Sequence, residues 1–134
     1  LDQLSGSTDY EELASVGFQN TFRKQDSDRI DRVYDYLLSD FQNEVSLSAT
    51  AAMLNMNTSA FCKFFKKRTG QTFTQILNEI RIGHACKLLM RKDMSIAQIC
   101  YQCGYSSQNY FNRKFRQIKS VSPGEYRKEF STPL

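Results

Sequence analysis

Two stretches of the chain decide its fold: SLSATAAMLNMN at residues 46–57 and SIAQICYQCGYS at residues 95–106. They align without gaps at a separation of 49 positions, and the correspondence continues beyond them at a separation of 50. The matched pairs in that continuation are Phe61 with Phe111, Lys63 with Arg113, Phe65 with Phe115, and Lys66 with Arg116. This internal repeat indicates that the chain contains the same small structural unit twice.

Each copy has the pattern of two helices joined by a tight turn. A short helix ends at a residue that tolerates positive φ, Asn55 in the first copy and Gly104 in the second. An apolar residue follows, and a polar residue then caps a longer helix. Two helices joined by a turn of three or four residues form a helix-turn-helix. The sequence therefore predicts two such units.

The rest of the chain predicts an all-α fold of about seven helices. Prolines occur only at Pro123 and Pro133, and β-branched residues never alternate with polar ones over a strand length. Asp28 is the predicted N-cap of the first helix, Thr72 caps a long central helix, and Gly70 follows the helix before it. The predicted helices span residues 29–41, 48–54, 58–68, 73–91, 95–103, 106–118 and 123–130.

These helices group into two subdomains joined by one long linker helix. The predicted parts are an acidic polar tail or interdomain linker at 1–27, a first helix-turn-helix subdomain at 28–71, the linker helix at 72–91, a second helix-turn-helix subdomain at 92–130, and a C-terminal tail at 131–134. The chain begins without Met, so we interpret it as a fragment of a longer protein or as a processed protein.

Composition predicts a small soluble domain, and its modest basic excess allows an anionic partner. The net charge is +4. Residues 1–27 contribute −3, from two basic and five acidic residues, and the remainder contributes +7, from 16 basic and 9 acidic residues. No apolar run reaches the roughly 18 residues of a membrane span, and the N-terminus does not resemble a signal peptide. We expect a cytoplasmic, nucleoid-associated protein.

The second helix of each unit is basic and amphipathic. Phenylalanines form one face, and Lys and Arg occupy the others. The basic residues are Lys63, Lys66, Lys67 and Arg68 in the first copy, and Arg113, Lys114, Arg116 and Lys119 in the second. One such helix is often only a solvated face. Two matching basic faces on repeated units favour insertion into the major groove of DNA.

Residues 28–130 resemble the DNA-binding domain of the AraC/XylS family of bacterial transcription regulators. The resemblance rests on residues 95–106, 110–116 and 121–127 of the second copy, and on residues 65–70 and 80–89 of the first copy and central helix. Three positions depart from the usual family pattern, where Asn55 replaces Gly and Cys100 and Cys103 replace small apolar residues. These changes are sterically mild.

The resemblance implies that the two recognition helices, at about 58–68 and 106–118, enter successive major-groove segments. A linker of about 19 residues spans roughly 29 Å, close to the ~34 Å of one DNA turn. The implied base-reading residues are Gln108, Asn109, Asn112 and Arg113 in the second copy, and Ser59, Ala60, Cys62 and Lys63 in the first. The expected phosphate contacts are Lys66, Lys67, Ser107, Arg116 and Lys119, with the helix N-termini at Thr72 and Ser95.

The two base-reading sets predict unequal roles. Arg grips guanine and Asn or Gln grips adenine through paired hydrogen bonds, so the second unit should read sequence better. In the first unit only Lys63 is a good long-range reader. Arg81, on the central helix, is expected to be structural, and His84, the only histidine, to be a packed or partly exposed side chain.

Three other functions remain as alternatives. Cys100 and Cys103 have metal or redox spacing, but no second cysteine pair accompanies them, and we expect the four cysteines to be reduced and mostly buried. No arrangement of catalytic residues or phosphate-binding glycine loop indicates an enzyme, and no cofactor is expected. A protein-interaction module would not need matched basic faces. The resemblance also implies an activator, with RNA polymerase as a further partner and an N-terminal sensor or dimerisation domain outside this chain.

Overall fold

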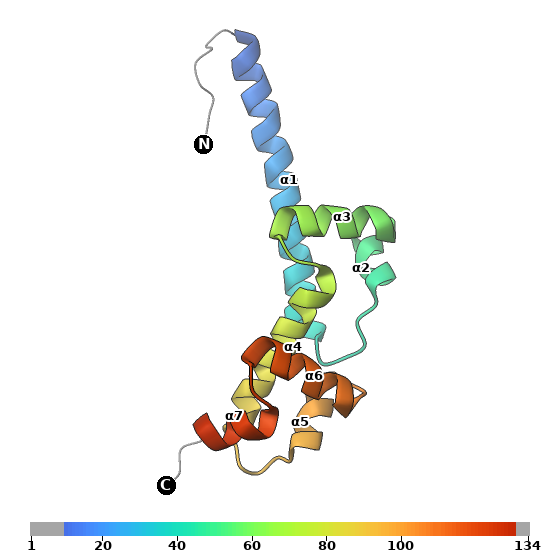
Figure 1. The fold of residues 1–134 in the computed structure, drawn as a ribbon. Coiled ribbons are helices and arrows are strands. Elements are labelled where there is room, and N and C mark those ends of the chain that lie inside the picture. Colours follow the sequence, from blue (N-terminus) through green and yellow to red (C-terminus); the bar gives the residue numbers. More distant parts are fainter. Residues whose placement is uncertain (1–9, 131–134) are drawn as a thin grey trace.

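The computed structural model describes residues 10–130, which form seven helices and no strand (Figure 1). The helices are α1 (Tyr10–Asp40), α2 (Leu47–Met53), α3 (Thr58–Thr69), α4 (Phe73–Leu89), α5 (Ile96–Gln102), α6 (Gln108–Lys119) and α7 (Pro123–Phe130). The predicted all-α class is confirmed. Within this part of the chain, no helix combines the length and the apolar character that crossing a membrane requires.

The first helix is much longer than predicted. The sequence placed its N-cap at Asp28, but α1 begins at Tyr10 and continues through Gly17 to Asp40. Asp28 therefore lies inside the helix, and its prediction as an N-cap is wrong. The N-terminal part of α1 extends beyond the other helices (Figure 1).

A tertiary contact stabilises the part of α1 just before residue 28, which the sequence pattern had placed outside the helix. Asp26 is buried and forms an ion pair with Arg68 near the C-terminal end of α3, and Arg29 lies 3.5 Å from the same carboxylate. This contact fixes α1 against the first subdomain. Of the predicted tail at 1–27, residues 10–27 are helical and residues 1–9 lie outside the described residues, as do residues 131–134 of the C-terminal tail. A linker role for 1–27 stays a prediction.

Polar side chains define where the helices of both subdomains begin. Asn57 Oδ1 accepts a hydrogen bond from Ala60 N at 2.7 Å at the start of α3. Ser107 does the same for Tyr110 N at 3.2 Å, so α6 begins at Gln108, two residues later than predicted. Because these caps satisfy backbone N–H groups that the helices leave unpaired, they fix the starts of both recognition helices.

The residues predicted to allow positive φ adopt it. Asn55 has φ of 57° and Gly104 has φ of 99°, while Gly70 ends α3 with φ of 82°. The two turns differ in their surroundings. A Cβ atom at Gly104 would collide with the carbonyl oxygen of Phe41. The second turn therefore requires glycine for two reasons, its positive φ and this close contact.

Two hydrophobic cores lie along α4, one for each subdomain. The N-terminal core packs Phe61 and Phe65 of α3 against the first turns of α4. The C-terminal core packs Phe111 and Phe115 of α6 against the second half of α4. α3 and α6 therefore lie at different heights along the linker helix (Figure 1). Because α4 serves both cores, it buries residues on more than one side.

Arg81 joins the subdomains, which confirms the structural role predicted for it. Its guanidinium donates to the carbonyl oxygens of Phe41 at 2.8 Å and Asn43 at 3.0 Å, just after α1 ends. The same group lies over the Tyr105 ring, with 5.3 Å from Cζ to the centroid. Partial burial lowers the pKa of Arg81, although Tyr105 opposes this change. Because Arg81 belongs to α4, these contacts join the subdomains through the linker helix, while the close approach of Gly104 to the Phe41 carbonyl brings them together directly.

Candidate nucleic-acid interface

The exposed surface of α6 carries the four predicted base readers of the second copy. Asn109, Asn112 and Arg113 are exposed, and Gln108 is half-buried. Phe111 and Phe115 occupy the opposite side, where they are completely buried. The amphipathic pattern of the helix therefore turns its amide and guanidinium groups away from the core.

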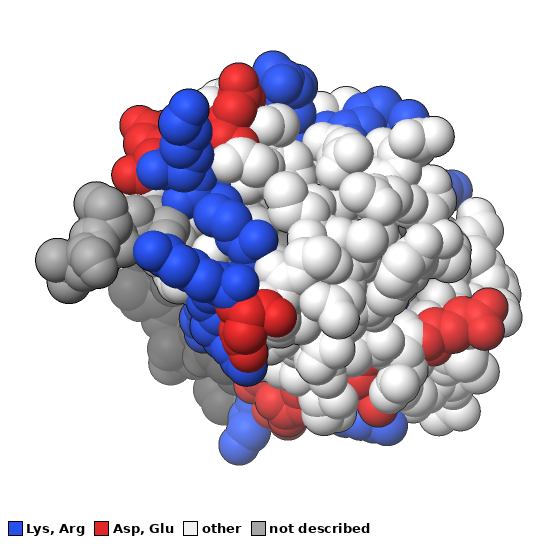
Figure 2. Space-filling model, turned by 90° about the horizontal axis from the view of Figure 1, so that it is seen from below, with Lys and Arg blue, Asp and Glu red and all other residues white. Residues whose placement is uncertain are grey.

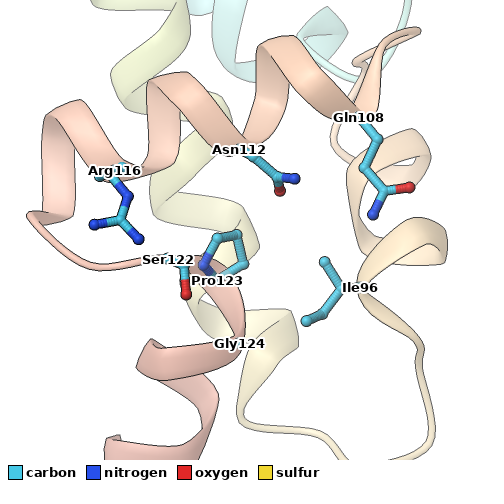
Figure 3. Close-up of a pocket in the computed structure, with 7 residues that line it drawn as sticks. All are labelled: Ile96, Gln108, Asn112, Arg116, Ser122, Pro123 and Gly124. Carbon is cyan, nitrogen blue, oxygen red and sulfur yellow. The ribbon is translucent and has the colours of Figure 1, made fainter.

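Part of this surface forms one wall of a shallow groove. Gln108, Asn112 and Arg116 project in a row from α6 toward Ile96 of α5 and the start of α7 (Figure 3). Arg116 Nη2 lies 3.5 Å from Glu125 Oε1, a weak pair between two exposed side chains. The row places two amides and one cation side by side, a set of groups that suits hydrogen bonding to bases and a phosphate.

Tyr110 separates Arg113 from the body of the protein. Arg113 Cζ lies 5.3 Å and Lys114 Nζ 5.4 Å from the centroid of the Tyr110 ring. Cation–π contacts of this kind stabilise the position of an arginine side chain. Tyr110 itself is half-buried and contacts the C-terminal core. The ring thereby holds the guanidinium at the surface of α6.

The corresponding surface of α3 is equally accessible but chemically poorer. Ser59, Ala60, Cys62 and Lys63 are all exposed. Cys62 is thus an exception to the expectation that the cysteines are mostly buried. Three of these four side chains are short, so only Lys63 reaches far beyond the helix.

Both recognition helices are strongly cationic. α3 and α6 each carry four Lys or Arg residues and no Asp or Glu. In contrast, α2 and α5 carry no charge at all. Seen from the end of the molecule that holds α5 and α7, most Lys and Arg gather on one side, with several Asp and Glu beside them, and the centre of the face is largely uncharged (Figure 2). The positive charge is therefore localised.

The predicted phosphate-contacting side chains are all exposed: Lys66, Lys67, Ser107, Arg116, Lys119, Thr72 and Ser95. Two of these residues, Thr72 and Ser95, already form hydrogen bonds within the protein. Thr72 and Ser95 form capping boxes with Gln75 and Gln98, which occupy their backbone N–H groups at 2.8 Å. These two helix N-termini therefore offer fewer free donors than the sequence suggested. Arg68 is engaged with Asp26.

One polar residue beside this surface was not predicted from the sequence. Asn78, on α4, is only 5% exposed and bonds to both Tyr105 and Tyr110. The local sequence did not indicate a role for Asn78, because its two hydrogen-bond partners lie 27 and 32 residues away along the chain.

The remaining candidate groups belong to the packing. Cys86, Cys100 and Cys103 lie in the C-terminal core, and burial raises the pKa of Cys103 to about 12. His84 is half-buried against Phe41, with ring centroids 5.1 Å apart. Burial and the neighbouring Lys87 lower the pKa of His84. Both observations agree with the packing roles predicted for these side chains.

Comparison with known proteins matches this arrangement to one family. The family model described as a helix-turn-helix domain matches residues 50–129, more than half of the chain. The chain is 30% identical over 105 residues to the transcriptional activator RhaR of Mannheimia succiniciproducens, and 32% identical over 99 residues to the transcriptional activator RhaS of Enterobacter sp. strain 638. These alignments cover 78% and 74% of this chain but only 38% and 36% of the two relatives.

Solved structures show the same fold. The C-terminal domain of the response regulator AraT from Geobacillus stearothermophilus superposes with a TM-score of 0.73 at 27% identity, covering 78% of this chain and 88% of that one. The DNA-binding domain of the transcriptional factor AdpA, solved in complex with a target DNA, gives a TM-score of 0.70 at 26% identity, covering 75% and 90%.

Proposed function

Because the chain belongs to the AraC/XylS family of DNA-binding transcription regulators, we propose that it binds double-stranded DNA sequence-specifically through α3 and α6. The observation that carries this proposal is the pair of equivalent exposed helices, each with four cations and no acidic residue. The 17 residues of α4 hold them apart. At ~1.5 Å per residue this helix is about 25 Å long, which suits neighbouring major-groove segments on one DNA face.

The two helices have different parts in this function. Gln108, Asn109, Asn112 and Arg113 read bases from α6, since they offer paired hydrogen-bonding groups to adenine and guanine. On α3, Lys63 is the main reader, and Ser59, Ala60 and Cys62 approach the bases without long polar groups. Phosphate binding by Lys66, Lys67, Ser107, Arg116 and Lys119 positions both helices.

The wider role proposed is activation of transcription at the bacterial nucleoid. RhaR and RhaS, similar to this chain, are named as transcriptional activators. The chain spans little more than a third of the length of these two relatives. The proposal therefore includes a sensor or dimerisation domain outside this chain. It also includes contact with RNA polymerase.

Fluorescence anisotropy with a labelled random-sequence duplex, across a series of salt concentrations, tests DNA binding directly. We expect the logarithm of the association constant to fall linearly with the logarithm of salt concentration, because Lys and Arg release the counterions of DNA. Absence of binding even at low salt would contradict the proposal and favour a protein-interaction module.

A further inference from the structure

Asn78 lies where the two subdomains meet on the linker helix. Its neighbour Leu77 belongs to the N-terminal core, and Ile82, one turn later, belongs to the C-terminal core. The Asn78 side chain is almost completely buried between them. A buried amide is costly unless its hydrogen bonds are made, so the partners of Asn78 are expected to be fixed in position.

Both partners belong to the second helix-turn-helix. The Tyr105 hydroxyl donates to Asn78 Oδ1 at 2.6 Å, and Asn78 Nδ2 donates to the Tyr110 hydroxyl at 3.2 Å. Tyr105 is the buried residue that follows Gly104 in the turn, and Tyr110 lies in the first turn of α6. Hydrogen bonds depend on angle as well as distance, whereas apolar contacts do not. This pair of bonds therefore constrains how α6 is oriented on α4, in addition to the packing of Phe111 and Phe115.

The same bonds lead to the DNA-facing side of α6. The Tyr110 ring that accepts from Asn78 also carries Arg113 against its face, with 5.3 Å between Cζ and the centroid. One aromatic ring thus connects the buried amide to the strongest proposed base reader. A change at Asn78 would alter the position of the ring, and with it the direction of Arg113.

The first subdomain has no equivalent of this arrangement. At the positions corresponding to Tyr105 and Tyr110 it has Met56 and Ala60, which have no hydroxyl groups. It is instead attached to α1, through the Asp26–Arg68 ion pair. Asn78 and its two tyrosines therefore act together with the Arg81 contacts to Phe41 and Tyr105 in setting the orientation of α6 relative to α3.

We propose that Asn78 is a positioning residue for DNA recognition, which orients α6 so that the protein discriminates between DNA sites by the spacing of their two half-sites. This inference rests on the proposed function. Spacing discrimination is the appropriate property to measure, because a rigid pair of helices accepts one separation and a loosened pair accepts several.

The test uses a duplex selected by the unaltered protein from a random library, together with versions of it that have one base pair inserted or deleted between the half-sites. The affinity ratio between the selected and altered spacings is measured for the protein and for three variants. Asn78→Ala removes both hydrogen bonds, and Tyr110→Phe removes one but keeps the ring beneath Arg113. Asn43→Ala is the matched control, since it makes the same exchange at an exposed residue whose carbonyl still accepts from Arg81.

We expect Asn78→Ala to reduce the spacing ratio by about fivefold, Tyr110→Phe to reduce it less, and Asn43→Ala to leave it unchanged. Circular dichroism establishes that each variant is folded at the temperature used, and Tyr110→Phe carries the test where Asn78→Ala does not fold. A ratio that stays at the original value, or affinity that falls equally at every spacing, would overturn the inference and leave the proposed function intact. If the unaltered protein binds no duplex at any salt concentration, both fail together.

Discussion

The two helix-turn-helix units have the same backbone plan but different surfaces. Both recognition helices have two phenylalanines on the buried face and four cations on the others. Their equivalent exposed residues differ: Ser59 corresponds to Asn109, Cys62 to Asn112, and Lys63 to Arg113. The two copies thus share a positive charge suited to phosphates, but the side chains able to form paired hydrogen bonds with bases are concentrated on α6. We therefore propose that the first unit mainly anchors the protein on the DNA backbone and that the second mainly reads the base sequence.

The units also differ in how they are attached. An ion pair between Asp26 and Arg68 joins the first unit to α1, and a buried hydrogen-bond network around Asn78 joins the second to α4. In the first unit the turn residue Asn55 is exposed, whereas in the second Gly104 is pressed against Phe41. The second turn therefore has less freedom to change than the first.

The largest effect is expected at this second turn. Gly104→Ala should lower the free energy of unfolding by about 3 kcal/mol or more, because alanine disfavours positive φ and its methyl group meets the Phe41 carbonyl. Urea denaturation measures the change. Gly70→Ala is the control: it has positive φ but no atom within 4 Å of the added methyl group, and should cost about 1 kcal/mol. Equal costs at the two glycines would contradict the close contact at Phe41.

The next largest effect is expected on DNA affinity, when a proposed base-reading residue is replaced. Arg113→Ala should weaken binding to a selected site by about 1–3 kcal/mol, which is roughly five- to 150-fold, and relax preference at one base pair. Lys63→Ala should weaken binding less and relax preference less, since a lysine ammonium is a flexible, strongly hydrated point charge, whereas the planar guanidinium of arginine presents two fixed donors to guanine. Anisotropy with the selected site and its single-base variants measures both. If the two substitutions relaxed specificity equally, each in its own half-site, the proposed inequality between the units would be wrong.

A smaller effect separates anchoring from reading. Lys66→Gln combined with Lys67→Gln should lower the slope of log affinity against log salt by about 2, with preference among sequences unchanged. Lys87→Gln combined with Lys92→Gln removes the same charge from exposed positions outside α3 and α6. This control should change the slope much less. Similar slopes for the two double variants would show that general charge, and not α3, attracts the DNA.

The smallest effect is expected at the first turn. Asn55→Gly should change the free energy of unfolding by less than about 1 kcal/mol, because asparagine already tolerates the φ of 57° found there. Thermal or urea unfolding measures it. A gain in stability comparable to the loss at Gly104→Ala would mean that the first turn is strained, and would contradict the greater freedom assigned to it.

Much of the fold could be predicted because its signals are local and occur twice. The helices from α2 to α7 begin and end within two residues of the predicted positions, since caps such as Asn57 and Ser107 act on backbone groups three residues away. The start of α1 could not be predicted in this way. Asp28 looked like a cap, but the contact between Asp26 and Arg68 joins residues 42 positions apart and favours helix through that region.

The candidate site likewise has a part that could be predicted from the local sequence and a part that could not. The exposure of the α3 and α6 side chains follows from helical periodicity, so the predicted surface is present, and its contacts with DNA stay a prediction. The role of Asn78 depends on two tyrosines that only the folded chain brings to it. Gln108 is half-buried for the same reason, because it lines the groove formed with α5 and α7.

Selection of binding sites from a random duplex library tests the inequality between the two units most directly. We predict one strongly specified half-site, which Arg113→Ala weakens, and a weakly specified half-site about one helical turn away, which Lys63→Ala affects. Two half-sites of equal specification, or a strong half-site that depends on Lys63 and not on Arg113, would contradict the assignment of α6 as the main reader.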